Sequence, residues 1–140
     1  SESIKVIVRV RPLNGSEKQR GCKSIVELTK KPPNQPHQTA EANNIKSFAY
    51  DAVFPESSEQ AQVYSKAAYS LVEHVLEGYN GTVFAYGQTG CGKTHTMMGV
   101  PSSDEHRGII PRTFSQIITE TKNDTAKTHL IRCSFIEIYN

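Results

Sequence analysis

The chain has 140 residues, of which 36% are hydrophobic and 21% are charged, a composition typical of one globular unit or part of one and not of a disordered chain. Its net charge of +2, from 16 Lys and Arg against 14 Asp and Glu, is too balanced to indicate nucleic-acid binding. No apolar run approaches the roughly 20 residues that span a bilayer, and the amino end lacks a secretory-signal pattern, so an intracellular protein is expected.

The three cysteines are Cys22, Cys91 and Cys133. They are odd in number and far apart, which fits neither a disulfide framework nor the usual spacing of metal ligands. A reducing compartment is therefore expected.

The first regular element is a strand from Ile4 to Val10, in which alternate residues are apolar. Pro12 ends it, because proline has no N–H for a ladder and biases the preceding residue away from helix. Residues 13–44 are polar and weakly patterned, and only Ile25–Leu28 is predicted as a strand there. A second small strand is predicted over Ile45–Tyr50.

A helix is predicted from Ser57, because Gln60 follows it at the spacing of a capping box. Apolar residues then recur at the helical period from Val63 to Leu76 and form one broad stripe. Gly78 is the natural end of the helix. We expect the stripe to pack on a sheet.

The segment Gly87–Thr94 matches in full the phosphate-binding loop, in which two glycines separated by four residues precede a lysine and a hydroxyl residue. Thr82–Tyr86, just before it, is predicted as a short apolar strand. The residues from Thr94 to Met98 can open a helix. Strand, loop and helix thus occur in the order that a nucleoside-triphosphate site requires.

The residue types of this loop suit a triphosphate. Gly87, Gly90 and Gly92 can adopt left-handed conformations that point successive N–H groups inward, and the field of the following helix adds to theirs. Lys93 can then reach the β- and γ-phosphates. The Thr94 hydroxyl lies where Mg²⁺ would bind.

Beyond the loop, the predicted helix is interrupted by a turn-rich insertion over residues 99–106. Helical spacing resumes at Ile110, with Pro111 in a first-turn position where its missing N–H costs nothing. The segment from Leu130 to Tyr139 has apolar residues on both faces, which predicts a central strand. Alternating helices and strands indicate an α/β fold.

At this point six separated stretches resemble the kinesin motor domain in order and spacing. They are Ile4–Asn14, Tyr50–Phe54, Gln62–Tyr64, Gly78–Met97, Arg107–Arg112 and Phe135–Asn140. The resemblance covers residues 1–140 except the polar stretch 15–44 and the insertion 100–106. It implies the amino-terminal portion of the motor domain, from a kinesin-2-like member whose motor stands at the amino end of its parent chain.

The resemblance also implies a fold and a function. The expected fold is the three-layer P-loop NTPase motor fold, a central sheet flanked by helices, incomplete in this chain. The expected function is ATP hydrolysis coupled to movement along microtubules, with ATP or ADP and Mg²⁺ bound, in the cytoplasm on the microtubule cytoskeleton. Microtubule contacts, a coiled-coil dimer partner and cargo are expected to involve segments beyond Asn140.

Residues are carried over from the family one at a time. Arg9, Arg11 and Pro12 would line the adenine side, and His95 would stack on the base; without the resemblance, the arginines read as a polar strand face and His95 as a local hydrogen-bonding residue. The remaining cofactor-binding residues are those of the loop: Gly87, Gln88, Thr89, Gly90, Cys91, Gly92, Lys93 and Thr94, the last also for Mg²⁺.

Two phosphate-sensing segments of the family, Asn-x-x-Ser-Ser-Arg and Asp-Leu-Ala-Gly-Ser-Glu, do not occur in these residues. We therefore expect no catalytic residue within 1–140, and nucleotide binding without efficient turnover by this stretch alone. Two alternatives stay open. Another P-loop NTPase would share only the loop, and a nonenzymatic nucleotide-dependent binding module would keep Lys93 and Thr94 without hydrolysis.

Overall fold

The first strand, β1 (Ile7–Arg9), pairs in parallel with β5 (Ala52–Phe54). The pairing extends by one hydrogen bond at each end, from Val10 N to the Phe54 carbonyl and from Asp51 N to the Val6 carbonyl. In this computed structural model, which describes residues 4–29, 38–42 and 46–138, the strand predicted over Ile4–Val10 is thus confirmed with shorter bounds. Its partner β5 was not predicted, because three residues are too few to show a period.

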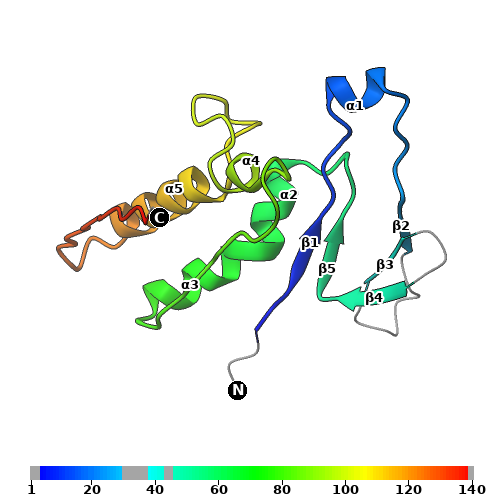
Figure 1. The fold of residues 1–140 in the computed structure, drawn as a ribbon. Helices are drawn as coiled ribbons and strands as arrows, with labels where there is room; N and C mark the ends of the chain where they lie inside the picture. Colours follow the sequence, from blue (N-terminus) through cyan, green and yellow to red (C-terminus); the bar gives the residue numbers. More distant parts are fainter. Residues whose placement is uncertain (1–3, 30–37, 43–45, 139–140) are drawn as a thin grey trace.

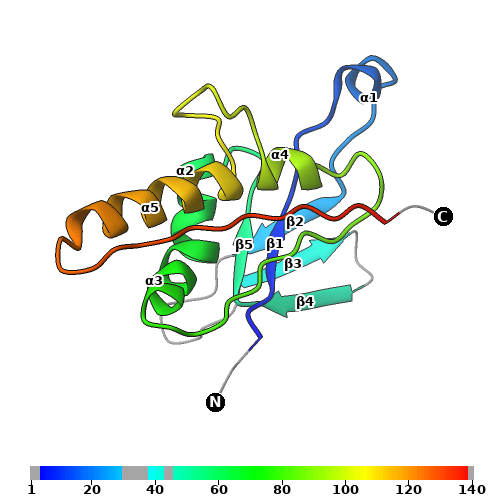
Figure 2. The same cartoon turned by 90° about the vertical axis from the view of Figure 1, so that its left-hand side faces the viewer.

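A second sheet is antiparallel, in the order β2 (Val26–Thr29), β3 (Gln38–Ala42) and β4 (Lys46–Tyr50). The short strands predicted near β2 and β4 are confirmed, although Ile45 lies outside the described residues. Neither β3 nor the short helix α1 (Gly15–Gln19) was predicted from the sequence. Figure 2 shows this sheet behind β1, with α1 standing apart above it.

One continuous helical run follows, made of α2 (Gln60–Tyr64), the π-helical turn η1 (Ser65–Tyr69) and α3 (Ser70–Leu76). The predicted start was wrong: the N-cap is Glu59, whose N–H donates to Gln62 Oε1 at 3.1 Å. The Ser57 cap fails because the Gln60 side chain is buried and makes other bonds. Gly78, at φ 106°, ends the run as predicted.

The core lies between this run and α5 (Ile109–Asn123). Val63, Tyr64, Ala68 and Ile109 are buried together, and partly buried hydrophobic residues pack against them: Phe54, Ala67, Val83 and Met97. The apolar stripe therefore packs on Phe54 of β5, on α5 and on the coil that contains Gly81 and Val83. Figure 1 shows α2, α3, α4 (Lys93–Met97) and α5 on one side of β1 and β5.

The interruption after α4 is confirmed. Gly99 and Arg107 form an isolated antiparallel bridge that closes the insertion, and Gly108 precedes α5 as its N-cap. Pro111 lies in the first turn of α5, as predicted. No helix in the described part of the chain is long and apolar enough to cross a membrane.

Two predicted strands are not present. Neither Thr82–Tyr86 nor residues 130–138 belong to a sheet among the described residues, and Figure 2 draws both as plain coil. Apolar side chains in both stay exposed, with Tyr86 at 94% and Phe135 at 86%. A segment of alternating apolar and polar residues forms a strand only if a neighbouring strand pairs with its backbone, and no described strand pairs with either segment. The α/β class is confirmed, with two small sheets instead of one large one.

Candidate functional site

The phosphate-loop residues adopt the backbone that the sequence predicts. Gly87, Gly90 and Gly92 all have positive φ, at 151°, 80° and 99°. Side chains rarely tolerate such values, which explains glycine at these positions. At Gly87 a Cβ would also lie 2.5 Å from the Cys91 sulfur.

Lys93 begins α4 and turns its side chain back into the loop. Its ammonium Nζ donates to the Gly87 carbonyl at 2.8 Å and to the Gln88 carbonyl at 2.9 Å. A positive charge therefore sits inside the curve of the loop. Thr94 follows on the first turn of α4 and is exposed. An ammonium, an exposed hydroxyl and glycine-rich backbone form a donor set that fits a phosphate chain with a bound divalent cation.

Beside the loop lies a pocket of about 270 Å³. It is lined by Arg9, Arg11, Pro12 and His95, the four residues that the resemblance assigns to the adenine side. Cys91 and Gly92 also line it. The other loop residues, Gly87 to Gly90, Lys93 and Thr94, do not line this pocket. The remaining lining residues are Val10, Glu56, Ser57, Ser58, Glu59, Gln60, Thr96, Glu105 and His106.

The Arg9 guanidinium forms part of the pocket wall. It donates to Gln60 Oε1 at 2.7 Å, to the Thr96 hydroxyl at 3.2 Å and to the Ser58 carbonyl at 3.2 Å. Burial lowers the pKa of Arg9 from its ordinary value. These bonds tie β1 to the start of α2 and to α4.

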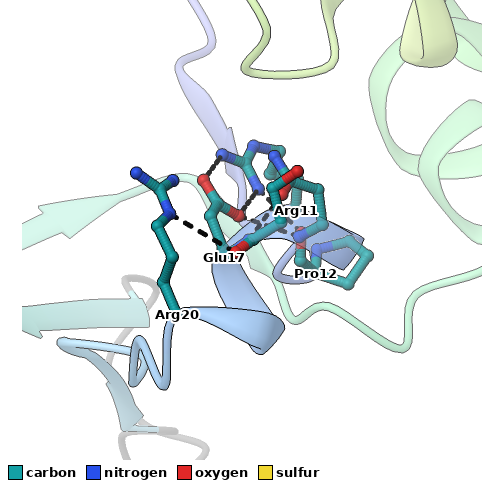
Figure 3. A network of polar contacts seen from close by, with 6 residues as sticks. Arg11, Pro12, Glu17 and Arg20 are labelled. Atoms are coloured by element: carbon teal, nitrogen blue, oxygen red, sulfur yellow. Dashed lines mark hydrogen bonds and ion pairs between the residues drawn. The ribbon is translucent and has the colours of Figure 1, made fainter.

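Arg11 is held differently, by a carboxylate on α1 (Figure 3). Its two terminal nitrogens donate to the two oxygens of Glu17 at 2.7 and 2.6 Å, and one also donates to the Pro12 carbonyl. The hydrogen bonds from Arg11, and next the N–H of Asn14, lower the pKa of Glu17 to about 2. The same hydrogen bond raises the pKa of Arg11.

Glu17 has a second role in the cap of α1. Asn14 Oδ1 accepts from Glu17 N at 2.9 Å, while Glu17 Oε2 accepts from Asn14 N at 2.8 Å. This reciprocal pair is a capping box. The Asn-x-x-Glu spacing was visible in the sequence, but no apolar run follows it, so the five-residue helix was not predicted.

His95 lies on α4, next to the buried side chain of Gln60. Burial, and then the charges of Arg9 and His106, lower the pKa of His95. Gln60 was predicted only as part of a helix cap, not as a site residue. The available signal was its place one turn before Val63 and Tyr64, on the face that becomes buried.

A family model, curated relatives and a solved structure all relate this chain to kinesin proteins. The family model for the kinesin motor domain matches residues 9–140. The chain is 43% identical over 143 residues to the kinesin-like protein KIF3C of Bos taurus and 45% identical over 152 residues to the kinesin-like protein klp-20 of Caenorhabditis elegans. These alignments cover 99% and 100% of the chain but only 18% and 22% of the relatives. The chain thus spans about a fifth of the length of these relatives.

A solved structure is also similar. It is described as "Structure of a fast kinesin: Implications for ATPase mechanism and interactions with microtubules". The match has a TM-score of 0.79 and 40% sequence identity, and it covers 89% of this chain and 34% of the other. At this identity the likeness extends beyond the fold to the sequence.

Proposed function

The chain belongs to the kinesin motor-domain family, and from this premise we propose that it forms the ATP-binding portion of a motor that couples ATP hydrolysis to movement along microtubules. Kinesin motor domains are ATPases, so the family supplies the reaction class. The observation that carries the proposal is the position of the Lys93 ammonium inside a loop of positive-φ glycines, next to a base-sized pocket.

The loop would hold the phosphates of ATP or ADP. Lys93 Nζ now bonds two loop carbonyls, and it would exchange these for β- and γ-phosphate oxygens, which are stronger acceptors because they are charged. The Thr94 hydroxyl would be a ligand of Mg²⁺, which would supply positive charge to offset that of the phosphates. Backbone N–H groups from Gln88 to Gly92 would complete the cradle.

The pocket would take the adenine. Its volume of about 270 Å³ lies near the lower bound of about 300 Å³ for ligand pockets, which suits a base better than a whole nucleotide. Pro12 and His95 would supply flat surfaces for it. Arg9 would act mainly by shaping the wall, because three of its contacts are already internal. Arg11 would border the base from the side of α1.

The family also supports proposals about partners and location. We propose that the full-length protein binds microtubules and works on the cytoplasmic cytoskeleton. Its microtubule contacts, a coiled-coil dimer partner and its cargo would involve residues outside 1–140, as would the groups that complete hydrolysis.

Substitution of Lys93 by Ala in the full-length protein tests the proposal. A hydrogen bond to a charged group contributes about 1.5–3 kcal/mol, so nucleotide affinity should fall by about tenfold to 150-fold. Calorimetry with ADP and a microtubule-stimulated ATPase assay measure the two consequences. Lys66→Ala is the matched control, since Lys66 is exposed on η1, outside the site.

Undiminished affinity and turnover in Lys93→Ala would refute the nucleotide site. Normal nucleotide binding by the unsubstituted protein without any turnover would instead favour the nonenzymatic binding module. The two results are separated by measuring binding and hydrolysis on the same preparation.

A further inference from the structure

Gln60 is the one amide or charged side chain that is buried among the residues the structure describes, with 4% of the residue exposed. It lies at the start of α2 and lines the pocket beside the phosphate loop. A buried amide costs free energy unless its donors and acceptor are all paired. The partners of Gln60 therefore show what its burial achieves.

The orientation of this amide is determined by its neighbours. Oε1 accepts from the Arg9 guanidinium at 2.7 Å, and a guanidinium can only donate. Nε2 donates to the main-chain carbonyls of His95 at 2.7 Å and His106 at 3.2 Å, and carbonyls can only accept. A flipped amide would put donor against donor and acceptor against acceptor.

Through these bonds one side chain joins four parts of the site. Arg9 belongs to β1, Gln60 to α2, His95 to the helix that follows the phosphate loop, and His106 to the insertion. Gly99, at the other end of the insertion, leaves room for the amide, since a Cβ there would lie only 2.8 Å from Gln60 Nε2. The amide therefore joins β1 and α2 to the main chain at His95 and His106, the part of the site that lines the pocket.

Gln60 also lies against the His95 ring and so influences how the ring is oriented. Nδ1 of His95 lies 3.3 Å from Gln60 Nε2. The two N–H groups of Nε2 already donate to the carbonyls of His95 and His106, so Nδ1 lies beside the amide as a further close contact that limits rotation of the ring. Burial, and next the charges of Arg9 and His106, lower the pKa of His95, which favours the neutral form of the ring.

We propose that Gln60 is a positioning residue for the base-side wall of the nucleotide site: its amide orients the His95 ring and the Arg9 guanidinium against the base and leaves the phosphate loop unaffected. This inference rests on the proposed nucleotide function. It assigns to Gln60 a share of the affinity for the base. The phosphates are held by Lys93 and the loop, which Gln60 does not contact through any of the hydrogen bonds above.

The test compares ligands with and without a base, using calorimetry on the nucleotide-depleted full-length protein. Affinities for ADP and for inorganic tripolyphosphate are measured in the unsubstituted protein, Gln60→Glu and Gln60→Met. Gln60→Glu keeps an acceptor for Arg9 but loses the donor to the two carbonyls, and Gln60→Met keeps the length without the amide. Gln62→Glu is the matched control, since Gln62 is exposed and its Oε1 only accepts a hydrogen bond from Glu59.

We expect ADP affinity to fall at least about fivefold in both Gln60 variants, the effect of one hydrogen bond, with tripolyphosphate affinity unchanged. The control should bind both ligands normally. Equal losses for both ligands, or no tripolyphosphate binding by either variant, would assign Gln60 a general structural role and overturn the proposal. So would unchanged ADP affinity.

Failure of the nucleotide site itself gives a different pattern. In that case Lys93→Ala would bind ADP and tripolyphosphate as well as the unsubstituted protein does. The unsubstituted protein would also show no preference for ADP over tripolyphosphate.

Discussion

Substitution of Gly108 by Ala should destabilise the junction between α4 and α5. Gly108 directly precedes α5, and its N–H donates to the Met98 carbonyl at the end of α4 at 2.8 Å. A Cβ at Gly108 would lie 2.6 Å from the carbonyl oxygens of Thr96 and Met97. These are main-chain atoms, so no side chain can rotate away to make room, and the two helices would have to separate.

The expected cost follows from these contacts. Gly108 has φ −84°, which alanine adopts easily, so the backbone conformation adds no strain. Overpacking of a close contact costs about 1–3 kcal/mol, and loss of the bond to Met98 about 1 kcal/mol more. The free energy of unfolding should therefore fall by about 2–4 kcal/mol. ADP affinity should fall as well, because the displaced helix carries Lys93 and Thr94.

Urea unfolding of the full-length protein, followed by circular dichroism, measures the change. Gly15→Ala is the control, since a Cβ at Gly15 meets nothing within 4 Å and its φ is not positive; it should be neutral or slightly stabilising. If Gly108→Ala proves as stable as Gly15→Ala, the packing argument for this junction is wrong.

Two further predictions concern single side chains. The pKa of Glu17 is lowered from 4.5 to about 2, so its bonds to Arg11 stabilise the fold at neutral pH, and this contribution is lost as pH falls from about 4.5 towards 2. Glu17→Gln should therefore be less stable than the unsubstituted protein at pH 7, and the unfolding curves of the two proteins should converge at low pH. A difference in stability that stays constant with pH would contradict the ion pair. Tyr64→Phe removes the hydrogen bond from the Tyr64 hydroxyl to Gln116 Oε1, which joins α2 to α5. In the same urea assay this substitution should lower the free energy of unfolding by about 1 kcal/mol. Tyr79→Phe is the control, because Tyr79 is exposed.

Local signals in the sequence predicted the parts of the site that depend on neighbouring residues. The glycines before Lys93 require positive φ, and the structure has them there. Gly78 ends a helix and Pro111 lies in the first turn of another, each because of its own backbone chemistry. Such features need no distant partner, which is why the loop and the helix after it were predicted from spacing alone.

Features that depend on distant partners were predicted poorly. Alternation over residues 130–138 predicted a central strand, yet no described neighbour supplies a ladder. The helix cap was placed at Ser57 because Gln60 had the right spacing, but Gln60 is drawn inward by Arg9 and two carbonyls. The spacing of neighbouring residues cannot show that a side chain will bond to partners that lie 35 to 51 residues away in the chain instead of capping a nearby helix.

By itself, the sequence determined the backbone of the loop before Lys93, because the positive φ of Gly87, Gly90 and Gly92 depends on the residue type at each position. Only the tertiary structure decided how the base-side pocket is built. Arg9 comes from β1, Gln60 from α2 and His95 from α4, and packing of these elements brings the three side chains into contact. The physical reason is that backbone conformation is set by adjacent residues, whereas the pairing of a buried amide is set by whatever the fold places around it.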